Sequence, residues 1–402
     1  MIMKYCFDEI IERRGTDAYK YMNLKMVCGR DDVLPMWVAD MDFATPPFVM
    51  NAIQKRCGQR VLGYTCSTDR YRESIASWCK SHYDWEVLPE HITYIPGVVA
   101  GIYLAMQAFT EKGDKILIQD PVYHPFRIVP EGNGREIVWN RLVRNEETFG
   151  MDLDALRNDI KGCKMMILCN PHNPAGVCWS RETLEQVAHI CSEEGVIVVS
   201  DEIHCDMIFG ERRHIPFASV SDEAKAITIT LQAPSKTFNM PGIVCSQAIV
   251  PDDSLREKYF DYIERSDMGL GNVFTFSCAE ACYSEEGDEW RRQMLEYVNG
   301  NIDALQSGIA AITDKIKIIR PQASFLVFMD CRDLMAELAA GKSDDEAQEC
   351  LVRFFADKCG LGFNPGNMFG KNGVGYMRVN MGSPRSTVEE ALSRIAEGLS
   401  TI

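Results

Sequence analysis

The sequence lacks the features that place a protein in a membrane or on nucleic acid. No hydrophobic run approaches the length needed to cross a bilayer, and the acid-containing N-terminal stretch has no long apolar core of the signal-peptide kind. Positive charge is also scarce, since 42 lysines and arginines stand against 58 aspartates and glutamates, a net charge of −16. Such a surface repels phosphates. We therefore expect a cytoplasmic protein with no nucleic-acid partner and no membrane partner.

Patterns for metal ligation and for a disulfide scaffold are missing as well. The 16 cysteines are scattered, and none of them forms the Cys-x-x-Cys pair that structural zinc sites favour. Several, including Cys169 and Cys191, lie in apolar runs where a free thiol behaves as a small hydrophobic group. This usage predicts no metal site and is typical of a reducing compartment.

Internal repeats and low-complexity segments are absent too, and what is present is a regular alternation of strand and helix patterns. The 402 residues are enough for two packed domains. Short apolar runs alternate with amphipathic stretches such as 181–195, which predicts an α/β domain with a mostly parallel central sheet between helices. The expected buried strands are 115–119, 136–140, 165–169, 196–200, 227–231 and 246–250.

The C-terminal third has a different pattern. A long helical segment near 285–312 is followed by the strand-like runs KIKII, SFLVFMD and GYMRVN, with a helix between the last two. We expect a smaller α+β domain over 285–402, a large domain over 51–284, and an N-terminal arm and helix over 1–50 that join the smaller domain.

Four chemically useful side chains follow the expected strands. Tyr123, Asn173, Asp201 and Lys236 each come at or just after a strand end, and ligands of open parallel sheets bind beyond those ends. A lysine amine can bind a carbonyl cofactor covalently and shuttle a proton, and an aspartate can pair with a protonated pyridine nitrogen. Each residue alone has a commoner explanation, as a surface lysine, a helix cap or a turn. Their combination predicts a pyridoxal-5′-phosphate (PLP) enzyme.

Two further segments suit an anionic cofactor and an anionic substrate. Gly97 permits a tight turn before a strongly apolar helix, and the backbone N–H groups of Val98, Val99 and Ala100 at its start would hold a phosphate. Arg378 lies in the strand-like GYMRVNMG, where a guanidinium needs a buried partner or a ligand such as a substrate carboxylate. The alternatives are a simple buried helix and an exposed strand arginine.

These residues resemble the class I/II aminotransferase family of fold-type I PLP enzymes over essentially the whole chain. Within that family the chain is most similar to the bacterial cystathionine β-lyase and cysteine C–S lyase group. The matching motifs are LPMWVADMDF at 34–43, GYT at 63–65, DPVYHPF, NPHNPAGVCW, SDEIHCD, SKTFN, and FGKNGVGYMRVNMGSPR at 369–385.

The resemblance implies a role for each matched position. Lys236 would bind the cofactor covalently, and Asp201 would pair with its ring nitrogen. The other cofactor contacts would come from Val98, Val99, Tyr64, Tyr123, Asn173, His204 and Ser235. The amino-acid substrate would be bound by Arg378, Val38, Ala39, Tyr123 and Asn173. Because Tyr64 would reach the phosphate of the neighbouring subunit, the resemblance also implies a homodimer whose active sites are shared.

Three positions depart from the family pattern. Val244 stands where aminotransferases have a phosphate-binding arginine and where the lyase group often has glutamine. Phe325 and Phe328 stand where relatives often carry tyrosine and tryptophan. These departures bear on cofactor affinity and on the choice of substrate.

The activity expected from the resemblance is a PLP-dependent carbon–sulfur β-lyase. Such an enzyme cleaves cystathionine or a related cysteine S-conjugate to a thiol, pyruvate and ammonia. An aminotransferase of small amino acids would use the same side chains, so it remains the alternative. A regulatory protein that keeps the fold without turnover is a third reading.

Overall fold

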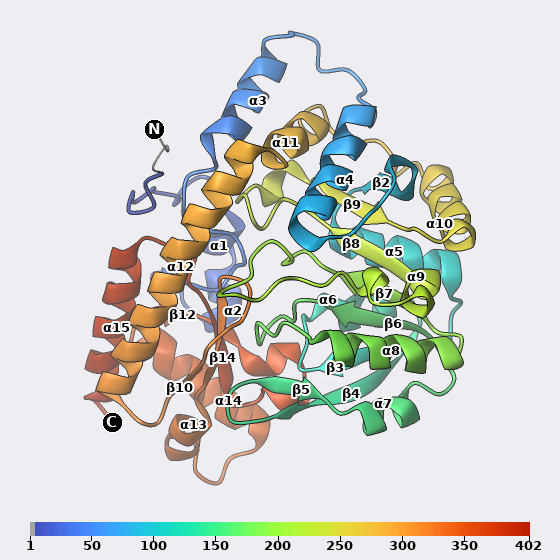
Figure 1. Cartoon of the computed structure of the whole chain (residues 1–402). Helices are drawn as coiled ribbons and strands as arrows, with labels where there is room; N and C mark the ends of the chain where they lie inside the picture. Colours follow the sequence, from blue (N-terminus) through green and yellow to red (C-terminus); the bar gives the residue numbers. More distant parts are fainter. Residues whose placement is uncertain (1–4) are drawn as a thin grey trace.

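The computed structural model describes residues 5–402, and its centre is an eight-stranded sheet (Figure 1). Five neighbouring strands, β8, β7, β6, β3 and β4, run parallel, and β9 and β5 flank them in the antiparallel direction. β2 lies beyond β9, pairs with it antiparallel and so runs in the same direction as the five. The expected α/β fold with a mostly parallel sheet is confirmed. The strands in sheet order are β2 (Ile92–Ile95), β9 (Ser246–Ile249), β8 (Thr228–Gln232), β7 (Ile197–Asp201), β6 (Cys163–Cys169), β3 (Lys115–Asp120), β4 (Glu136–Arg144) and β5 (Phe149–Met151).

All six strands expected for this sheet are present, but two differ in detail from the expectation. β4 was expected to be buried, yet only Asn140 and Leu142 are buried in it, because the short β5 is all that flanks β4 on its outer side. β9 runs antiparallel to β8 because a short segment without a crossover helix of its own connects the two strands. That segment carries Lys236.

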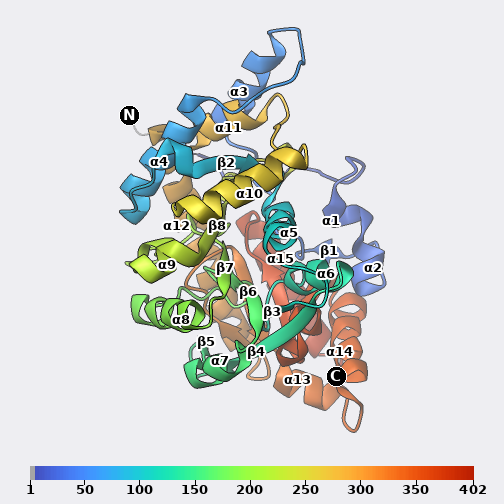
Figure 2. The same cartoon turned by 90° about the vertical axis from the view of Figure 1, so that its right-hand side faces the viewer.

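Helices cover both faces of the sheet (Figure 2). α5 (Val98–Phe109), α6 (Pro125–Gly132) and α10 (Asp253–Arg265) lie on one face, and α7 (Leu153–Asp159), α8 (Arg181–Glu193) and α9 (Asp222–Ile227) lie on the other. α8 begins where the sequence pattern places it, because the Ser180 hydroxyl accepts a hydrogen bond from the Thr183 N–H. Burial of apolar side chains on both faces fixes the sheet's position.

A second, four-stranded antiparallel sheet lies in the C-terminal part of the chain. Its strands in order are β10 (Lys317–Ile319), β11 (Leu326–Asp330), β14 (Tyr376–Asn380) and β13 (Asn364–Pro365). α12 (Glu285–Ile312) occupies the expected helical segment and packs against α15 (Arg385–Leu399). Ser284 caps α12, and three acidic side chains in its first turn favour the helix dipole. Two helices, α13 (Arg332–Leu338) and α14 (Asp344–Arg353), replace the single one expected between β11 and β14.

The N-terminal arm lies against this C-terminal part. Its expected helix is two short ones, α1 (Tyr19–Met22) and α2 (Leu24–Cys28), and β1 (Leu34–Pro35) pairs in parallel with β12 (Leu361–Gly362). At the β2 end of the large sheet, α11 (Thr275–Cys282) packs against α3 (Pro47–Cys57) and α4 (Asp69–Tyr83) (Figure 1). The domain boundaries at 50/51 and 284/285 remain predictions.

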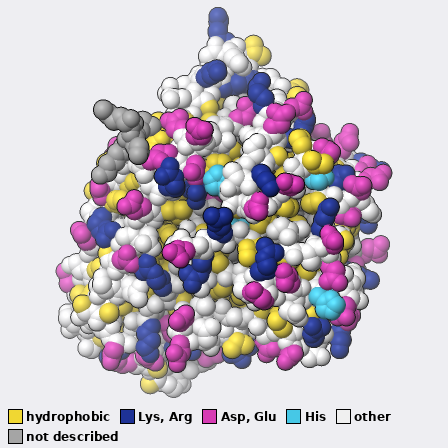
Figure 3. All heavy atoms as spheres, in the orientation of Figure 1, with side chains coloured by type: hydrophobic (Ala, Val, Ile, Leu, Met, Phe, Trp, Pro, Cys, Tyr) yellow, Lys and Arg dark blue, Asp and Glu magenta, His cyan; other side chains and the backbone are white. Residues whose placement is uncertain are grey.

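The surface mixes both signs of charge. On the face drawn in Figure 3, lysines and arginines are interspersed with aspartates and glutamates. The 16 cysteines are free thiols, and most of them are buried. Across residues 5–402, no helix combines the length and the apolar character that a membrane span requires.

Candidate active site

A cavity of about 230 Å³ opens beyond the carboxyl ends of the parallel strands. Tyr123 follows β3, Asn173 follows β6, Asp201 ends β7 and Lys236 follows β8, so neighbouring strands bring four distant residues together. Nine of the predicted site residues line the cavity: Ala39, Val98, Val99, Tyr123, Asn173, Asp201, His204, Ser235 and Lys236.

The amine of Lys236 lies in this cavity with one hydrogen-bond acceptor. Its Nζ donates to the Ala39 carbonyl at 2.8 Å. Burial lowers the pKa of Lys236 to about 8, although the carboxylates of Asp40 and Asp201 oppose the shift and Arg378 adds to it. A lysine with this pKa is a nucleophile and a proton acceptor close to neutral pH.

Asp201 is the buried acid of the cavity. Its side chain is 4% exposed, and its Oδ1 accepts one hydrogen bond, from the Ile203 N–H at 3.1 Å. Burial raises the pKa of this carboxyl to about 7, because it outweighs the opposing effects of the Ile203 N–H and the Lys236 charge. A protonated ring nitrogen would stabilise the anion.

The start of α5 forms a cradle of backbone donors. Gly97 has φ 108°, a conformation that favours glycine, and it turns the chain so that α5 begins at Val98 inside the cavity wall. The first helical bond runs from the Gly101 N–H to the Gly97 carbonyl, which leaves the preceding N–H groups for a ligand. The Ser235 side chain lines the same cavity. Such a set suits a phosphate dianion.

Arg378 is buried beside the cavity without a carboxylate partner. One Nη donates to Asn173 Oδ1 at 3.0 Å, and the other donates to Asn364 Oδ1 at 2.7 Å and to the Trp37 carbonyl at 3.2 Å. The guanidinium lies over the Phe369 ring at 4.7 Å, and its Nε has no partner among the described residues. Burial lowers its pKa to about 10, so it remains a cation near neutral pH. Neutral partners leave its charge available to an anion.

His204 is a neutral group of the cavity. It is 3% exposed, and its Nδ1 has no hydrogen-bond partner among residues 5–402. Burial lowers its pKa to about 3, and Lys236 and Arg378 add to the shift. Its ring lies 6.3 Å from that of Phe325. An uncharged imidazole with a free nitrogen can accept or donate a hydrogen bond to a ligand.

Some predicted residues lie elsewhere. Tyr64 is 100% exposed in the segment between α3 and α4. Val38 does not line the cavity, and its carbonyl accepts a hydrogen bond from Asn380 Nδ2 at 2.6 Å. Val244 lines the cavity, whereas Phe328 stacks on Tyr376 in the hydrophobic core, behind the Phe369 ring. Phe328 is therefore placed to act on the site only through its neighbours.

Sequence reasoning missed three asparagines that hold the site together. Asn364 bonds Arg378, Asn380 bonds two carbonyls of the arm, and Asn239 bonds three backbone groups of the arm. Asn380 follows Arg378 by two residues in β14, and side chains two apart on a strand share a face. That spacing, and the presence of Asn239 in SKTFN and of Asn380 in GYMRVN, were the available signals.

Comparisons with known proteins show which family the chain belongs to. The sequence pattern of the family described as "Aminotransferase class I and II" matches residues 31–395. Cystathionine beta-lyase PatB of Bacillus subtilis (strain 168) is 38% identical over 396 residues, 98% of this chain and 100% of the relative. The PLP-bound C–S lyase of Staphylococcus hominis is similar in structure, with a TM-score of 0.90, 31% identity and coverage of 99% of this chain and 98% of the other. The PLP-containing cystalysin of Treponema denticola gives a TM-score of 0.91 at 28% identity, with 99% and 100% covered. With nearly its whole length matched and its polar residues gathered at the strand ends, the chain belongs to the class I and II aminotransferase family.

Proposed function

We propose that the protein is a PLP-dependent carbon–sulfur β-lyase that cleaves L-cystathionine or a related cysteine S-conjugate to a thiol, pyruvate and ammonia. One observation carries the proposal: a single cavity holds a lysine amine and a buried carboxylate, and a buried guanidinium without an anionic partner adjoins it. The similarity to PatB over the full length selects the lyase reaction from those that such a cavity supports.

The residues present fit PLP. The unpaired N–H groups at the start of α5 and the Ser235 hydroxyl would hold the phosphate, and Lys236 would hold the cofactor covalently. Asp201, whose pKa is raised by burial, would be stabilised as an anion by the protonated ring nitrogen. The Tyr123 ring would pack on the cofactor, and the Asn173 amide and His204 would hydrogen-bond to the phenolate oxygen of the cofactor.

In the proposed reaction, Arg378 would bind the substrate carboxylate. Its guanidinium is already held in a fixed orientation by hydrogen bonds to Asn173, Asn364 and the Trp37 carbonyl. Bound PLP supplies a conjugated ring that takes up the electron pair left at the substrate Cα. The substrate amine would first replace Lys236 on the cofactor, which frees the Lys236 amine. Neutral Lys236 would then remove the Cα proton, and the electron pair left at Cα would form a Cα=Cβ bond as the sulfur leaves Cβ with the C–S bonding pair. The proton on Lys236 is then available to the departing thiolate. Lys236 would rejoin the cofactor and release the enamine product, which water would hydrolyse to pyruvate and ammonia.

The proposal includes a homodimer in the cytoplasm. Tyr64, which is wholly exposed between α3 and α4, would contact the phosphate in the neighbouring subunit. Val61 and Leu62 in the same segment are 70% and 66% exposed, so the segment presents apolar surface that a second copy would cover. The alternation of charge over the rest of the visible surface suits a protein in solution.

Pyruvate release from L-cystathionine tests the function directly. PLP-loaded enzyme, assayed without any keto acid, is expected to release pyruvate and ammonia in equal amounts and for many turnovers. Turnover that begins only when a keto acid is added would make the protein an aminotransferase. Bound PLP with no reaction toward any amino acid would support the regulatory reading.

Arg378→Lys is expected to weaken substrate binding strongly. Lysine offers a single point charge where the guanidinium makes three bonds, so Asn173, Asn364 and the Trp37 carbonyl lose partners inside the protein. We expect kcat/KM to fall on the order of 100-fold, mainly through KM, with the cofactor still bound. Steady-state kinetics beside Arg265→Lys, an exposed arginine on α10, provides the check. An unchanged KM would contradict the carboxylate assignment.

A further inference from the structure

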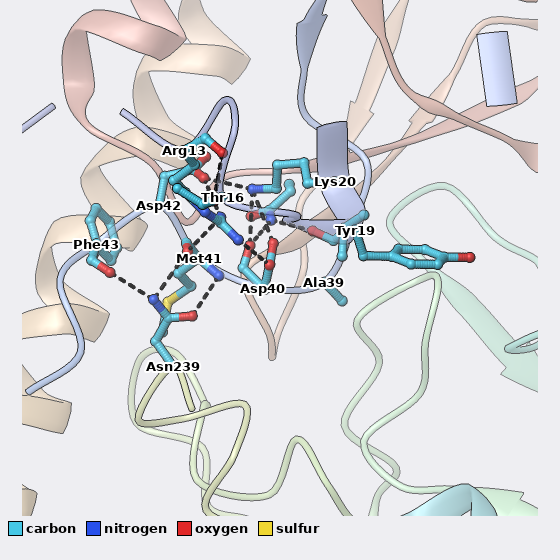
Figure 4. Close-up of polar contacts among 12 residues, drawn as sticks. Arg13, Thr16, Tyr19, Lys20, Ala39, Asp40, Met41, Asp42, Phe43 and Asn239 are labelled. Carbon is cyan, nitrogen blue, oxygen red and sulfur yellow. Dashed lines mark hydrogen bonds and ion pairs between the residues drawn. The ribbon is translucent and has the colours of Figure 1, made fainter. Parts of the chain in front are cut away.

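Four charged side chains form a cluster in the N-terminal arm (Figure 4). Arg13 Nη2 lies 2.6 Å from Asp40 Oδ2, and Arg13 Nη1 lies 2.8 Å from Asp42 Oδ1. Lys20 Nζ lies 3.2 Å from Asp40 Oδ1 and 2.8 Å from Asp42 Oδ1. The Lys20 side chain is 0% exposed, and the other three are between 15% and 21% exposed. We refer to Arg13, Lys20, Asp40 and Asp42 as the arm cluster; its formal charges cancel.

Asp40 of the arm cluster ends the segment 37–40, whose backbone contacts the active site. In this segment, the Trp37 carbonyl accepts from Arg378 and the Ala39 carbonyl accepts from Lys236. Lys20 bonds both ends of this segment. Its backbone carbonyl accepts a hydrogen bond from Trp37 Nε1 at 2.9 Å, and its Nζ donates to the Asp40 carbonyl at 3.2 Å. A shift of the segment would therefore move both acceptors.

Neutral side chains hold the same segment from the other side. Asn380 Nδ2 donates to the carbonyls of Val38 and Asp40, and Asn239 bonds the Met41 N–H and carbonyl. These contacts fix the backbone but contribute no net charge. The arm cluster differs from them, because replacing one of its members leaves an unbalanced charge next to Ala39, which lines the cavity.

We propose that the arm cluster positions two groups for the reaction. It fixes the Ala39 carbonyl against the Lys236 amine, and its cations, Arg13 and Lys20, balance the Asp40 carboxylate that acts on that amine. Lys20, Arg13 and Asp42 act through Asp40 and the backbone. The inference rests on the proposed function, because it assigns Lys236 to the same chemistry.

The electrostatic part follows from the surroundings of Lys236. The groups whose charges act on its amine are Asp40, Arg378 and Asp201, and the uncharged His204 lies beside them. Asp40 is the strongest of the charges that favour the protonated form. Lys20 and Arg13 in turn hold the pKa of Asp40 below its ordinary value against the effect of burial. Removing Asp40's charge favours the neutral Lys236 nitrogen, and removing Lys20's charge favours the protonated one.

The test is a pH titration of the visible absorbance of the PLP-loaded enzyme, which reports protonation of the Lys236 nitrogen while it is joined to the cofactor. Asp40→Asn is expected to move the midpoint to lower pH, and Lys20→Met to higher pH, each by roughly half a pH unit or more. Lys20→Met is also expected to reduce kcat/KM about 10-fold or more through displacement of the Ala39 carbonyl.

Opposite shifts separate this proposal from general damage to the fold, which would move both midpoints the same way. Lys25→Met, which changes an exposed lysine on α2 in the same manner, is expected to leave the midpoint unchanged. The double variant Lys20→Met/Asp42→Asn restores a neutral cluster and is expected to return the midpoint toward that of the parent enzyme. Coincident midpoints in Asp40→Asn and the parent would overturn the proposal, even if Lys20→Met fails to fold. The lyase proposal fails independently, on the cystathionine assay.

Discussion

Replacing Lys236 with alanine is expected to abolish turnover and the visible absorbance of covalently bound cofactor together. Within the candidate cavity, Lys236 supplies an amine whose pKa is lowered to about 8 and whose nearest acceptor is the neutral Ala39 carbonyl. The same nitrogen would both bind the cofactor and take the Cα proton, so its loss removes two functions. A fall in kcat of at least about 1,000-fold is the expected scale. Steady-state pyruvate assays and absorbance spectra on the same samples measure both effects.

The matched control is Lys164→Ala, an exposed lysine in β6 of the same sheet. Its spectrum and rate are expected to match those of the parent enzyme. The cofactor phosphate can still bind at the start of α5 in Lys236→Ala, so a small primary amine added in solution is expected to restore part of the proton transfer. Retention of the visible absorbance by Lys236→Ala would mean that another group binds the cofactor.

The sequence predicts the site well where chemistry follows strand ends. Tyr123, Asn173, Asp201 and Lys236 could be placed together because buried parallel strands are recognisable from their apolar runs and end at one rim. The start of α12 was also predictable, because Ser284 and the acids after it favour a helix start.

The arm could not be predicted in the same way. Its contacts with Asn239 and Asn380 join residues about 200 and 340 positions apart, and no periodic pattern reports a contact at that separation. The exposure of β4 escaped prediction for a related reason, since burial depends on which strand lies beyond it. Local pattern therefore predicts the scaffold and the strand-end residues, and tertiary packing decides what supports them.

Asp201→Asn is expected to slow the reaction strongly while leaving the cofactor covalently bound. The Asp201 carboxylate is buried, its one hydrogen bond comes from the Ile203 N–H, and its pKa is raised to about 7. An asparagine of the same shape keeps that bond through its oxygen but provides no negative charge for the ring nitrogen. The electrostatic stabilisation it removes corresponds to a loss in kcat on the order of 100- to 1,000-fold.

The two readouts of Asp201→Asn separate its role from that of Lys236. Visible absorbance is expected to persist, because Lys236 is unchanged, whereas turnover falls. Asp261→Asn, an exposed acid on α10 paired with Arg265, serves as the control and is expected to keep full activity. Parental kcat in Asp201→Asn would show that the carboxylate does not act on the ring nitrogen. A spectrum that shifts while kcat falls would place the effect on the electronic state of the bound cofactor, as the buried, singly hydrogen-bonded carboxylate leads us to expect.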